Sequence, residues 1–216
     1  MYDLRSKIEI QAAEVAGRGS VVEWDGCSRV FVPVFADQDY SPEKLALRYK
    51  DYSGGTEGFT RAYKTILDHA PPSYKPILLH LANEPSKPMA IHCTAGKDRT
   101  GVICALVLSL CGVDDEIVAQ EYALTDLGLS TKWKTSVIEH LMANPALKGD
   151  KEGAWNMIGA KADNMRSCLK MIKKEFGGAE NYMIEKCGLT KEQVDRIRSN
   201  LIVEHPPIHT QVSHNL

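Results

Sequence analysis

The chain has 216 residues, of which 44% are hydrophobic and 25% charged, and its formal net charge is -2. This is the composition of an ordinary globular protein, and the length suffices for one good core, so we expect a single domain. A net charge this small excludes an overall basic field that would attract nucleic acid or anionic membranes non-specifically. Any anion must therefore be recognised by a local site.

Six cysteines are spread along the sequence without a Cys-x-x-Cys pair, which argues against a zinc ribbon or a thioredoxin-like redox motif. We find no secretory signal pattern, so we expect reduced thiols and a cytoplasmic protein. The most apolar stretch, residues 101–113, is about half of the ~20 residues that cross a bilayer. We therefore expect a buried helix there and no integral membrane segment.

The front of the chain predicts a short strand-like start before Ser6, then one helix and two further strands. Ser6 is a suitable N-cap for a helix over residues 7–15. Residues 21–24 and 29–35 are rich in β-branched and aromatic side chains, and the Asp25-Gly26 pair between them is the strongest hairpin signal in the sequence. We expect a strand on each side of this turn.

The middle and back of the chain are predicted to be mostly helical. Apolar residues recur at helical spacing over 59–83, with a break at Pro71-Pro72 that predicts two helices. Residues 89–92 are mostly apolar and predict a buried central strand. After position 99 we expect only helices, one ended by Gly177-Gly178 and the last one started by a capping box of Thr190 and Gln193.

These elements predict an α/β domain over residues 1–204. Its small central sheet would be mostly parallel and flanked by helices, and its C-terminal half would be helical. The polar, proline-containing residues 205–216 are predicted to form a flexible tail.

Residues 91–101 read Ile-His-Cys-Thr-Ala-Gly-Lys-Asp-Arg-Thr-Gly and join a nucleophile to an anion-binding loop. Cys93 would end a strand, the amides of residues 94–98 would turn inward, and Arg99 would open a helix, which together bind phosphate. Arg99 lies six positions after Cys93, so its planar guanidinium can return over the pocket and hold two phosphate oxygens. These features favour the Cys93 thiolate and predict hydrolysis of a phosphomonoester through a covalent intermediate.

The other residues of this string have supporting roles. Gly96 permits a tight loop, and Gly101 would let the helix pack closely against the sheet. A Thr100 hydroxyl could hydrogen-bond the sulfur and help it leave. His92 is better explained as a structural residue that orients the loop than as a catalytic base, because adjacent strand residues point to opposite faces. The loop residues expected to bind substrate are Thr94, Ala95, Gly96, Lys97 and Thr100.

Other interpretations of the string fit less well. A Walker A loop would need glycine at position 91, which is Ile, and Ser or Thr at position 98, which is Asp. A metal pair of His92 and Cys93 has no companions at useful spacing, so we expect no metal and no cofactor. Sulfur transfer remains an alternative, because rhodanese-like enzymes also place a cysteine loop at a helix N-terminus, although residues 97–101 argue against it.

The string from His92 to Gly101 resembles the signature of the atypical tyrosine phosphatases of bacteria and fungi, whose members include dual protein and phosphoinositide phosphatases. Residues 3–6 and 182–201 resemble that family's other marked regions, so the likeness covers most of the chain. The resemblance implies a cysteine-phosphatase-like fold. Its implied substrates are phosphotyrosine and also phosphoserine, phosphothreonine or phosphoinositides.

The same resemblance implies a role for each residue of the loop. Cys93 would be the nucleophile, Arg99 the phosphate clamp and Asp98 an acid inside the loop, while Lys97 would add positive charge at the pocket rim. Lipid-type phosphatases with a related loop often carry a basic residue directly after the cysteine. Thr94 stands there in this sequence, which weighs against a phosphoinositide substrate.

The general acid has alternatives, because the more familiar tyrosine phosphatases place it on a separate upstream loop. Asp37 and Asp39 follow the strand predicted to end at Phe35, near the sheet edge where ligands bind in α/β folds. The alternative is a solvated turn in which Asp39 caps the next helix, and this alternative fits Asp37 better. We hypothesise that Asp98 is the acid. Asp3 would neighbour the site by resemblance, and is as readily explained as a partner of Arg5 or of loop amides.

One departure concerns the start of the chain. Family members usually carry an Asn-Phe-Arg-Asp-Leu-Gly-like motif ahead of the segment that matches residues 3–5, and this chain starts at that segment. The alternative is therefore a domain that lacks an N-terminal segment and persists as a phosphate-binding module without turnover. Phosphopeptide binding without phosphate release would identify such a module.

Overall fold

The computed structural model describes residues 1–17, 21, 25–143 and 149–203. Its strands are β1 (Tyr2–Asp3), β2 (Val30–Phe31) and β3 (Ile91–His92). The front helices are α1 (Lys7–Val15), the 3-10 helix η1 (Asp37–Tyr40), α2 (Pro42–Ser53), α3 (Gly55–His69) and α4 (Pro71–Asn83). The back helices are α5 (Asp98–Leu110), α6 (Asp115–Ala123), α7 (Thr125–Gly128), α8 (Thr131–Met142), α9 (Lys151–Ile158), α10 (Ala162–Phe176), α11 (Ala179–Asn181), the π-helix η2 (Tyr182–Lys186) and α12 (Lys191–Leu201).

The described strands form one parallel sheet in the order β2-β1-β3. In the central strand, Asp3 lies opposite Phe31 on one side and His92 on the other. Because the strands run in the same direction, the segments that follow them leave from the same edge of the sheet. Helix α1, the segment leading to η1 and the loop after β3 therefore meet there. The fold is α/β, as the sequence predicted.

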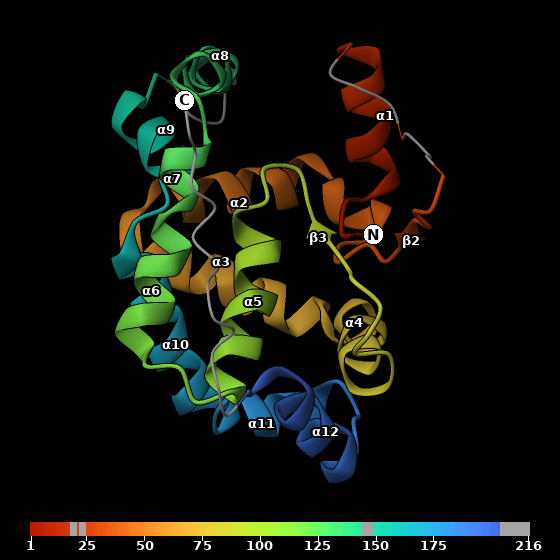
Figure 1. The fold of residues 1–216 in the computed structure, drawn as a ribbon. Coiled ribbons are helices and arrows are strands. Elements are labelled where there is room, and N and C mark those ends of the chain that lie inside the picture. The colour runs from red at the N-terminus through yellow and green to blue at the C-terminus, as the bar shows by residue number, and fades with distance from the viewer. Residues whose placement is uncertain (18–20, 22–24, 144–148, 204–216) are drawn as a thin grey trace, which may run out of the picture.

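Helices make up most of the molecule, and the small sheet lies to one side of them (Figure 1). Helix α3 packs against α2, α5 and α10. It buries Phe59, Tyr63, Ile66 and Leu67 completely, which confirms the helical spacing seen in the sequence. A smaller apolar cluster lies between α8 and α9. Among the described residues, no helix has the length and apolar character needed to span a membrane.

Several predicted boundaries are confirmed. Ser6 caps α1, and the helix covers residues 7–15 as expected. The chain divides into two helices at Pro71, Gly177 ends α10 with a left-handed φ of 71°, and Thr190 with Gln193 forms the capping box of α12. The predicted tail, residues 205–216, lies outside the described residues.

Three expectations need correction. Residues 89–92 were expected to hold a buried central strand, but β3 is only partly buried and lies at an edge of the described sheet, because β1 stands between it and β2. The strand expected over residues 29–35 is reduced to Val30–Phe31, and it pairs in parallel with β1. Pro33 has no N–H group to continue the ladder. The other half of the expected hairpin falls mostly on residues 22–24, outside the described residues. Gly101 was expected to pack on the sheet, but a Cβ built there would lie 3.0 Å from the Tyr122 ring, so its close neighbour is helix α6.

Candidate active site

The loop after β3 has the geometry of an anion site. Cys93 is buried at the end of the strand, and α5 begins five residues later at Asp98. Gly96 has a φ of 65°, a left-handed value that glycine adopts without strain. Among the described residues, no acceptor contacts the backbone N–H groups of positions 94–100. Unpaired amides at the N-terminus of a helix favour an anion.

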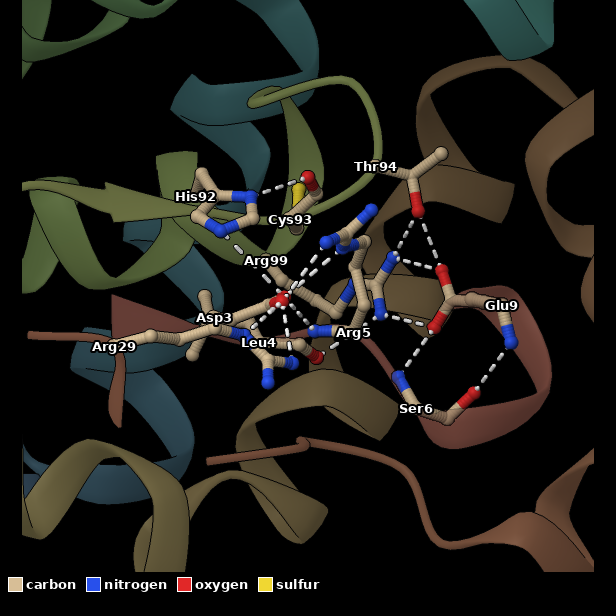
Figure 2. Close-up of polar contacts among 10 residues, drawn as sticks. All are labelled: Asp3, Leu4, Arg5, Ser6, Glu9, Arg29, His92, Cys93, Thr94 and Arg99. Carbon is tan, nitrogen blue, oxygen red and sulfur yellow. Dashed lines mark hydrogen bonds and ion pairs between the residues drawn. The ribbon is translucent and has the colours of Figure 1, made fainter. Parts of the chain in front are cut away.

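Arg99 lies beside this loop and is held by a carboxylate that the sequence analysis did not identify. Its Nη1 donates to Glu9 Oε2 at 2.7 Å, and its Nη2 donates to Glu9 Oε1 at 2.6 Å. Further donations go to the Leu4 carbonyl at 3.2 Å and to the Thr94 hydroxyl at 3.1 Å (Figure 2). The guanidinium is mostly buried. Its four terminal N–H groups are thus engaged, while Nε contacts no acceptor among the described residues.

Glu9 and Arg99 each shift the pKa of the other toward the charged form. Burial by itself would raise the pKa of Glu9, but hydrogen bonds and charge from Arg99 outweigh it and lower that pKa to about 2. Burial likewise opposes the charge on Arg99, and Glu9 outweighs this to raise the pKa of Arg99. The Tyr40 hydroxyl also donates to Glu9, and burial is the largest cause that raises the pKa of Tyr40 to about 12. Both members of the ion pair are charged at neutral pH.

The position of Glu9 follows from the start of α1. The Ser6 side chain accepts from the Glu9 amide at 3.1 Å, and the Glu9 carboxylate accepts from the Ser6 amide at 2.9 Å, so the two residues form a capping box. Helix α1 follows β1 directly, and β1 pairs with β3. The cap therefore places the Glu9 carboxylate beside the loop that β3 feeds.

Asp98 is the first residue of α5, and its carboxylate is partly exposed, with 23% of the side-chain surface accessible. The Tyr63 hydroxyl donates to Asp98 Oδ1 at 2.9 Å, and the Lys97 ammonium lies 3.6 Å from the same oxygen. The candidate acid is thus held on one side only. Its other oxygen, Oδ2, accepts no hydrogen bond from the described residues.

Lys97 does not lie at the pocket rim as expected. Its side chain is 3% exposed, and its ammonium donates to the carbonyls of Met157 and Gly159 beside the ring of Phe59. The loop is tight, so a side chain next to Asp98 can turn into the protein instead of outward. Its positive charge lies near Asp98 and near the C-terminal end of α9. The prediction that Lys97 adds positive charge at the rim of the pocket is therefore wrong.

The two threonines of the loop differ in their surroundings. Thr94 is exposed, and its hydroxyl donates to Glu9 Oε1 while accepting from Arg99. The Thr100 hydroxyl is buried and has no hydrogen-bond partner among the described residues, the Cys93 sulfur included. The expected bond from Thr100 to the sulfur is therefore not formed in this structure. Ala95 and Gly96 contribute backbone to the loop.

Asp3 and His92 support the loop from the sheet. Asp3 is fully buried, and its carboxylate accepts from Arg5 and Arg29 (Figure 2). Burial would raise the pKa of Asp3, but the Arg5 bonds, followed by Arg29, lower it. His92 Nδ1 lies 3.1 Å from the Cys93 carbonyl, and Nε2 lies 3.7 Å from Asp3 Oδ1. This geometry fits a structural role for both residues.

Asp39 is occupied elsewhere. Its carboxylate accepts from the Ala36 amide at 2.9 Å, within η1, and pairs with Lys44 at 2.7 Å. The first contact closes the start of η1 itself, whereas the next helix, α2, is capped by the Ser41 side chain, so the prediction that Asp39 caps the next helix is wrong. Asp37, on the same short helix, is exposed. Of the carboxylates considered from sequence, Asp98 is the one that adjoins the loop and lacks a full set of partners among the described residues.

Comparison with known proteins decides the family. Residues 1–203 match the model of a family described as "Tyrosine phosphatase family". The chain belongs to the tyrosine phosphatase family. This confirms the resemblance that residues 92–101 carried.

Two relatives have matching names. A "tyrosine-protein phosphatase" of Nostoc commune is 29% identical over 161 residues, which is 74% of this chain and 54% of the relative. The "triple specificity protein phosphatase PtpB" of Mycobacterium tuberculosis is 23% identical over 128 residues, which is 54% of this chain and 44% of the relative. The chain thus spans about half the length of the curated relatives it matches.

In this member of the tyrosine phosphatase family, the structure brings together some of the predicted site residues and adds others. Cys93, Thr94, Asp98 and Arg99 lie in or beside the loop, whereas Asp39 does not join it. Two contributors were missed, Glu9 and Tyr63. Glu9 had a signal, because Ser6-x-x-Glu9 is a capping box that fixes a carboxylate at the first turn of a helix. Tyr63 had none, because its buried position fits any core residue. Among the described residues there is no cluster of three potential metal ligands.

Proposed function

We propose that this chain hydrolyses phosphomonoesters through a cysteinyl-phosphate intermediate on Cys93. The observation that carries the proposal is the loop itself. In it a buried cysteine precedes amides that contact no acceptor among the described residues and then the start of α5, with the fixed guanidinium of Arg99 beside it. Such an arrangement stabilises an anionic phosphoryl group and a thiolate together. Membership of the tyrosine phosphatase family supports the same chemistry.

The proposed reaction has two steps. The Cys93 sulfur forms a bond to phosphorus as the bond from phosphorus to the leaving oxygen breaks, and Asp98 gives that oxygen a proton. Water then attacks phosphorus, the sulfur–phosphorus bond breaks, and the Asp98 carboxylate takes a proton from the water. The loop amides and Arg99 hold the non-bridging oxygens in both steps. The proposal needs no metal and no cofactor.

Phosphotyrosine is the first proposed substrate, in a phosphorylated protein partner. One relative is named a triple specificity phosphatase, which supports extending the proposal to phosphoserine, phosphothreonine or phosphoinositides. A panel of phosphotyrosine, phosphoserine and phosphoinositide substrates would rank them. We place the reaction in the cytoplasm, because all six cysteines are free and the proposed nucleophile must stay reduced.

The test of this function is turnover by the Cys93→Ser variant. We expect the wild-type chain to release phosphate from phosphotyrosine peptide, to be inhibited by vanadate and to be insensitive to chelators. Cys93→Ser should release none, because a serine hydroxyl is not ionised at neutral pH and lacks the reactivity of a thiolate. Retained turnover in Cys93→Ser would rule out the covalent mechanism.

A second candidate function is a phosphate-binding module without turnover. The observation that favours it is that Glu9, Thr94 and the Leu4 carbonyl already occupy the four terminal N–H groups of Arg99. A phosphate held by two of its donors would have to displace one of these contacts. Binding of a phosphotyrosine peptide with no release of phosphate by the wild-type chain would support this alternative over the enzyme.

A further inference from the structure

A chain of buried hydroxyl groups leads from the interior to the candidate acid. Tyr63 on α3 is completely buried, and its hydroxyl lies 2.9 Å from Asp98 Oδ1 and 2.6 Å from the hydroxyl of Tyr122 on α6. The Lys97 ammonium lies 3.6 Å from the same Asp98 oxygen. The hydrogen bond from Tyr63 and the ion-pair contact with Lys97 are thus both made to Oδ1, and none of the described residues donates to Oδ2.

We propose that Tyr63 is a positioning residue for catalysis. Its hydroxyl donates to Oδ1 of Asp98 and thereby keeps the transferable proton on the other oxygen, Oδ2. The inference deepens the proposed function and depends on it, because it takes Asp98 to be the general acid. It adds a residue from a helix that lies outside the loop motif.

The direction of the hydrogen bonds follows from counting protons. A tyrosine hydroxyl has one proton, and an ionised carboxylate can only accept. Tyr63 therefore donates to Asp98, and its oxygen accepts the proton of Tyr122. Burial raises the pKa of Tyr63 well above its ordinary value, so the phenol stays a donor throughout the working pH range.

The same bond decides where a neutral Asp98 carries its proton. An acid proton on Oδ1 would face the proton of Tyr63, so the acid form with its proton on Oδ2 is favoured. The leaving oxygen takes this proton as its bond to phosphorus breaks. The carboxylate that remains keeps the Tyr63 bond on Oδ1, and it accepts the proton of the attacking water on Oδ2 in the second step.

Packing holds the hydroxyl in place. The Tyr63 ring lies edge-on to Phe59, with centroids 5.6 Å apart, and edge-on to Tyr122, with centroids 6.3 Å apart. Rings in such contacts have little freedom to turn away. Asp98 is therefore oriented by a rigid group instead of by mobile solvent.

The test measures kcat/KM for aryl phosphates whose leaving groups differ in basicity. A basic leaving group needs a proton from the acid, whereas a strongly acidic phenol leaves without one. We expect Tyr63→Phe to lower kcat/KM about tenfold for phosphotyrosine-like leaving groups. For a dinitrophenyl leaving group, the loss should be less than about twofold. Asp98→Asn should show the same selectivity with a larger loss, since general acid catalysis contributes roughly 100-fold or more.

Tyr182→Phe is the matched control. Tyr182 is also completely buried, and its hydroxyl donates to the Leu67 carbonyl on the same helix as Tyr63, at 2.7 Å. This variant loses a comparable buried hydrogen bond. Its kcat/KM should depend on the leaving group in the same way as that of the wild type.

The outcomes distinguish a failure of the inference about Tyr63 from a failure of the proposed phosphatase function. Selective loss in both Asp98→Asn and Tyr63→Phe supports the inference. Selective loss in Asp98→Asn alone overturns it and leaves the phosphatase proposal standing. Uniform loss in Asp98→Asn overturns both the acid role and the inference. If Tyr63→Phe does not fold, Tyr122→Phe takes its place. A selective loss of kcat/KM that is smaller than that of Asp98→Asn supports the chain of donors. A dependence of kcat/KM on the leaving group equal to that of the wild type overturns it.

Discussion

The Glu9 carboxylate fixes the one guanidinium on which phosphate binding is proposed to depend. Its two oxygens hold Nη1 and Nη2 of Arg99 in a bidentate pair, which sets the plane of the group. Nε remains without a partner among the described residues, and Thr94 covers the neighbouring Nη2. A phosphate that binds through this edge therefore replaces the hydroxyl of Thr94 and leaves the pair with Glu9 intact.

Glu9→Gln tests this role with little change in shape. Glutamine also serves as the fourth residue of a capping box, so the start of α1 should persist while the charge is lost. We expect kcat/KM for an aryl phosphate to fall about tenfold, the effect of losing a charge-assisted hydrogen bond.

Glu14→Gln is the control for this change, since Glu14 is exposed on the same helix. It should behave as wild type. Equal activity of the two variants would show that Arg99 needs no carboxylate to hold it.

At the level of single residues, the sequence predicted what the loop contains and failed on what surrounds it. Cys93, Asp98 and Arg99 could be proposed as site residues because all three lie within one short string whose spacing is informative. Glu9 and Tyr63 lie on other helices and contact residues of the same loop, and only the folded structure shows these contacts. Lys97 was misplaced because a motif gives the order of side chains and not the direction in which each one points.

At the level of elements, the residue that caps α1 helps to position the site. Ser6 holds the first turn of α1, and that turn carries Glu9. Ser6→Ala should therefore lower the free energy of unfolding by about 1 kcal/mol and also reduce kcat/KM. Urea unfolding and steady-state rates measure the two effects.

Thr190→Ala supplies the comparison, because Thr190 closes the equivalent capping box at the start of α12. We expect a similar loss of stability, about 1 kcal/mol, with no loss of activity. If both variants lose activity equally, the cap of α1 has no special connection with the site.

Helix boundaries were the best-predicted part of the fold. Proline pairs, glycines and capping boxes act locally, so α1, α4, α10 and α12 began or ended where their residues indicated. Strands were predicted less well. Each described strand has two residues, and its partners come from distant parts of the chain, so the parallel pairing of β1 with both neighbours had no local signal.

At the level of the whole molecule, the carboxylates of Glu9 and Asp3 predict sensitivity to acid. Arg99 lowers the pKa of Glu9 to about 2 and Arg5, with Arg29, lowers that of Asp3, in each case against the effect of burial. A carboxylate with a depressed pKa stabilises the fold above its unfolded value of about 4, and this contribution is lost as the pH falls through the folded value. For Glu9 it amounts to about 3 kcal/mol.

The urea midpoint should therefore drop between about pH 5 and about pH 2, and it should drop less in Glu9→Gln, which has no such carboxylate. The same pH dependence in both proteins would show that the Glu9 pair contributes nothing to acid stability.

The central claim is that phosphate passes through the sulfur of Cys93. Its most direct test is a rapid denaturing quench of the wild-type chain during turnover of an aryl phosphate, followed by mass spectrometry of the peptide that contains Cys93. We predict a phosphate on that cysteine, its absence in Cys93→Ser, and its presence in Cys104→Ser, which alters a thiol further along α5. Turnover with phosphate on a different residue, or with no phosphorylated cysteine at any time point, would contradict the account.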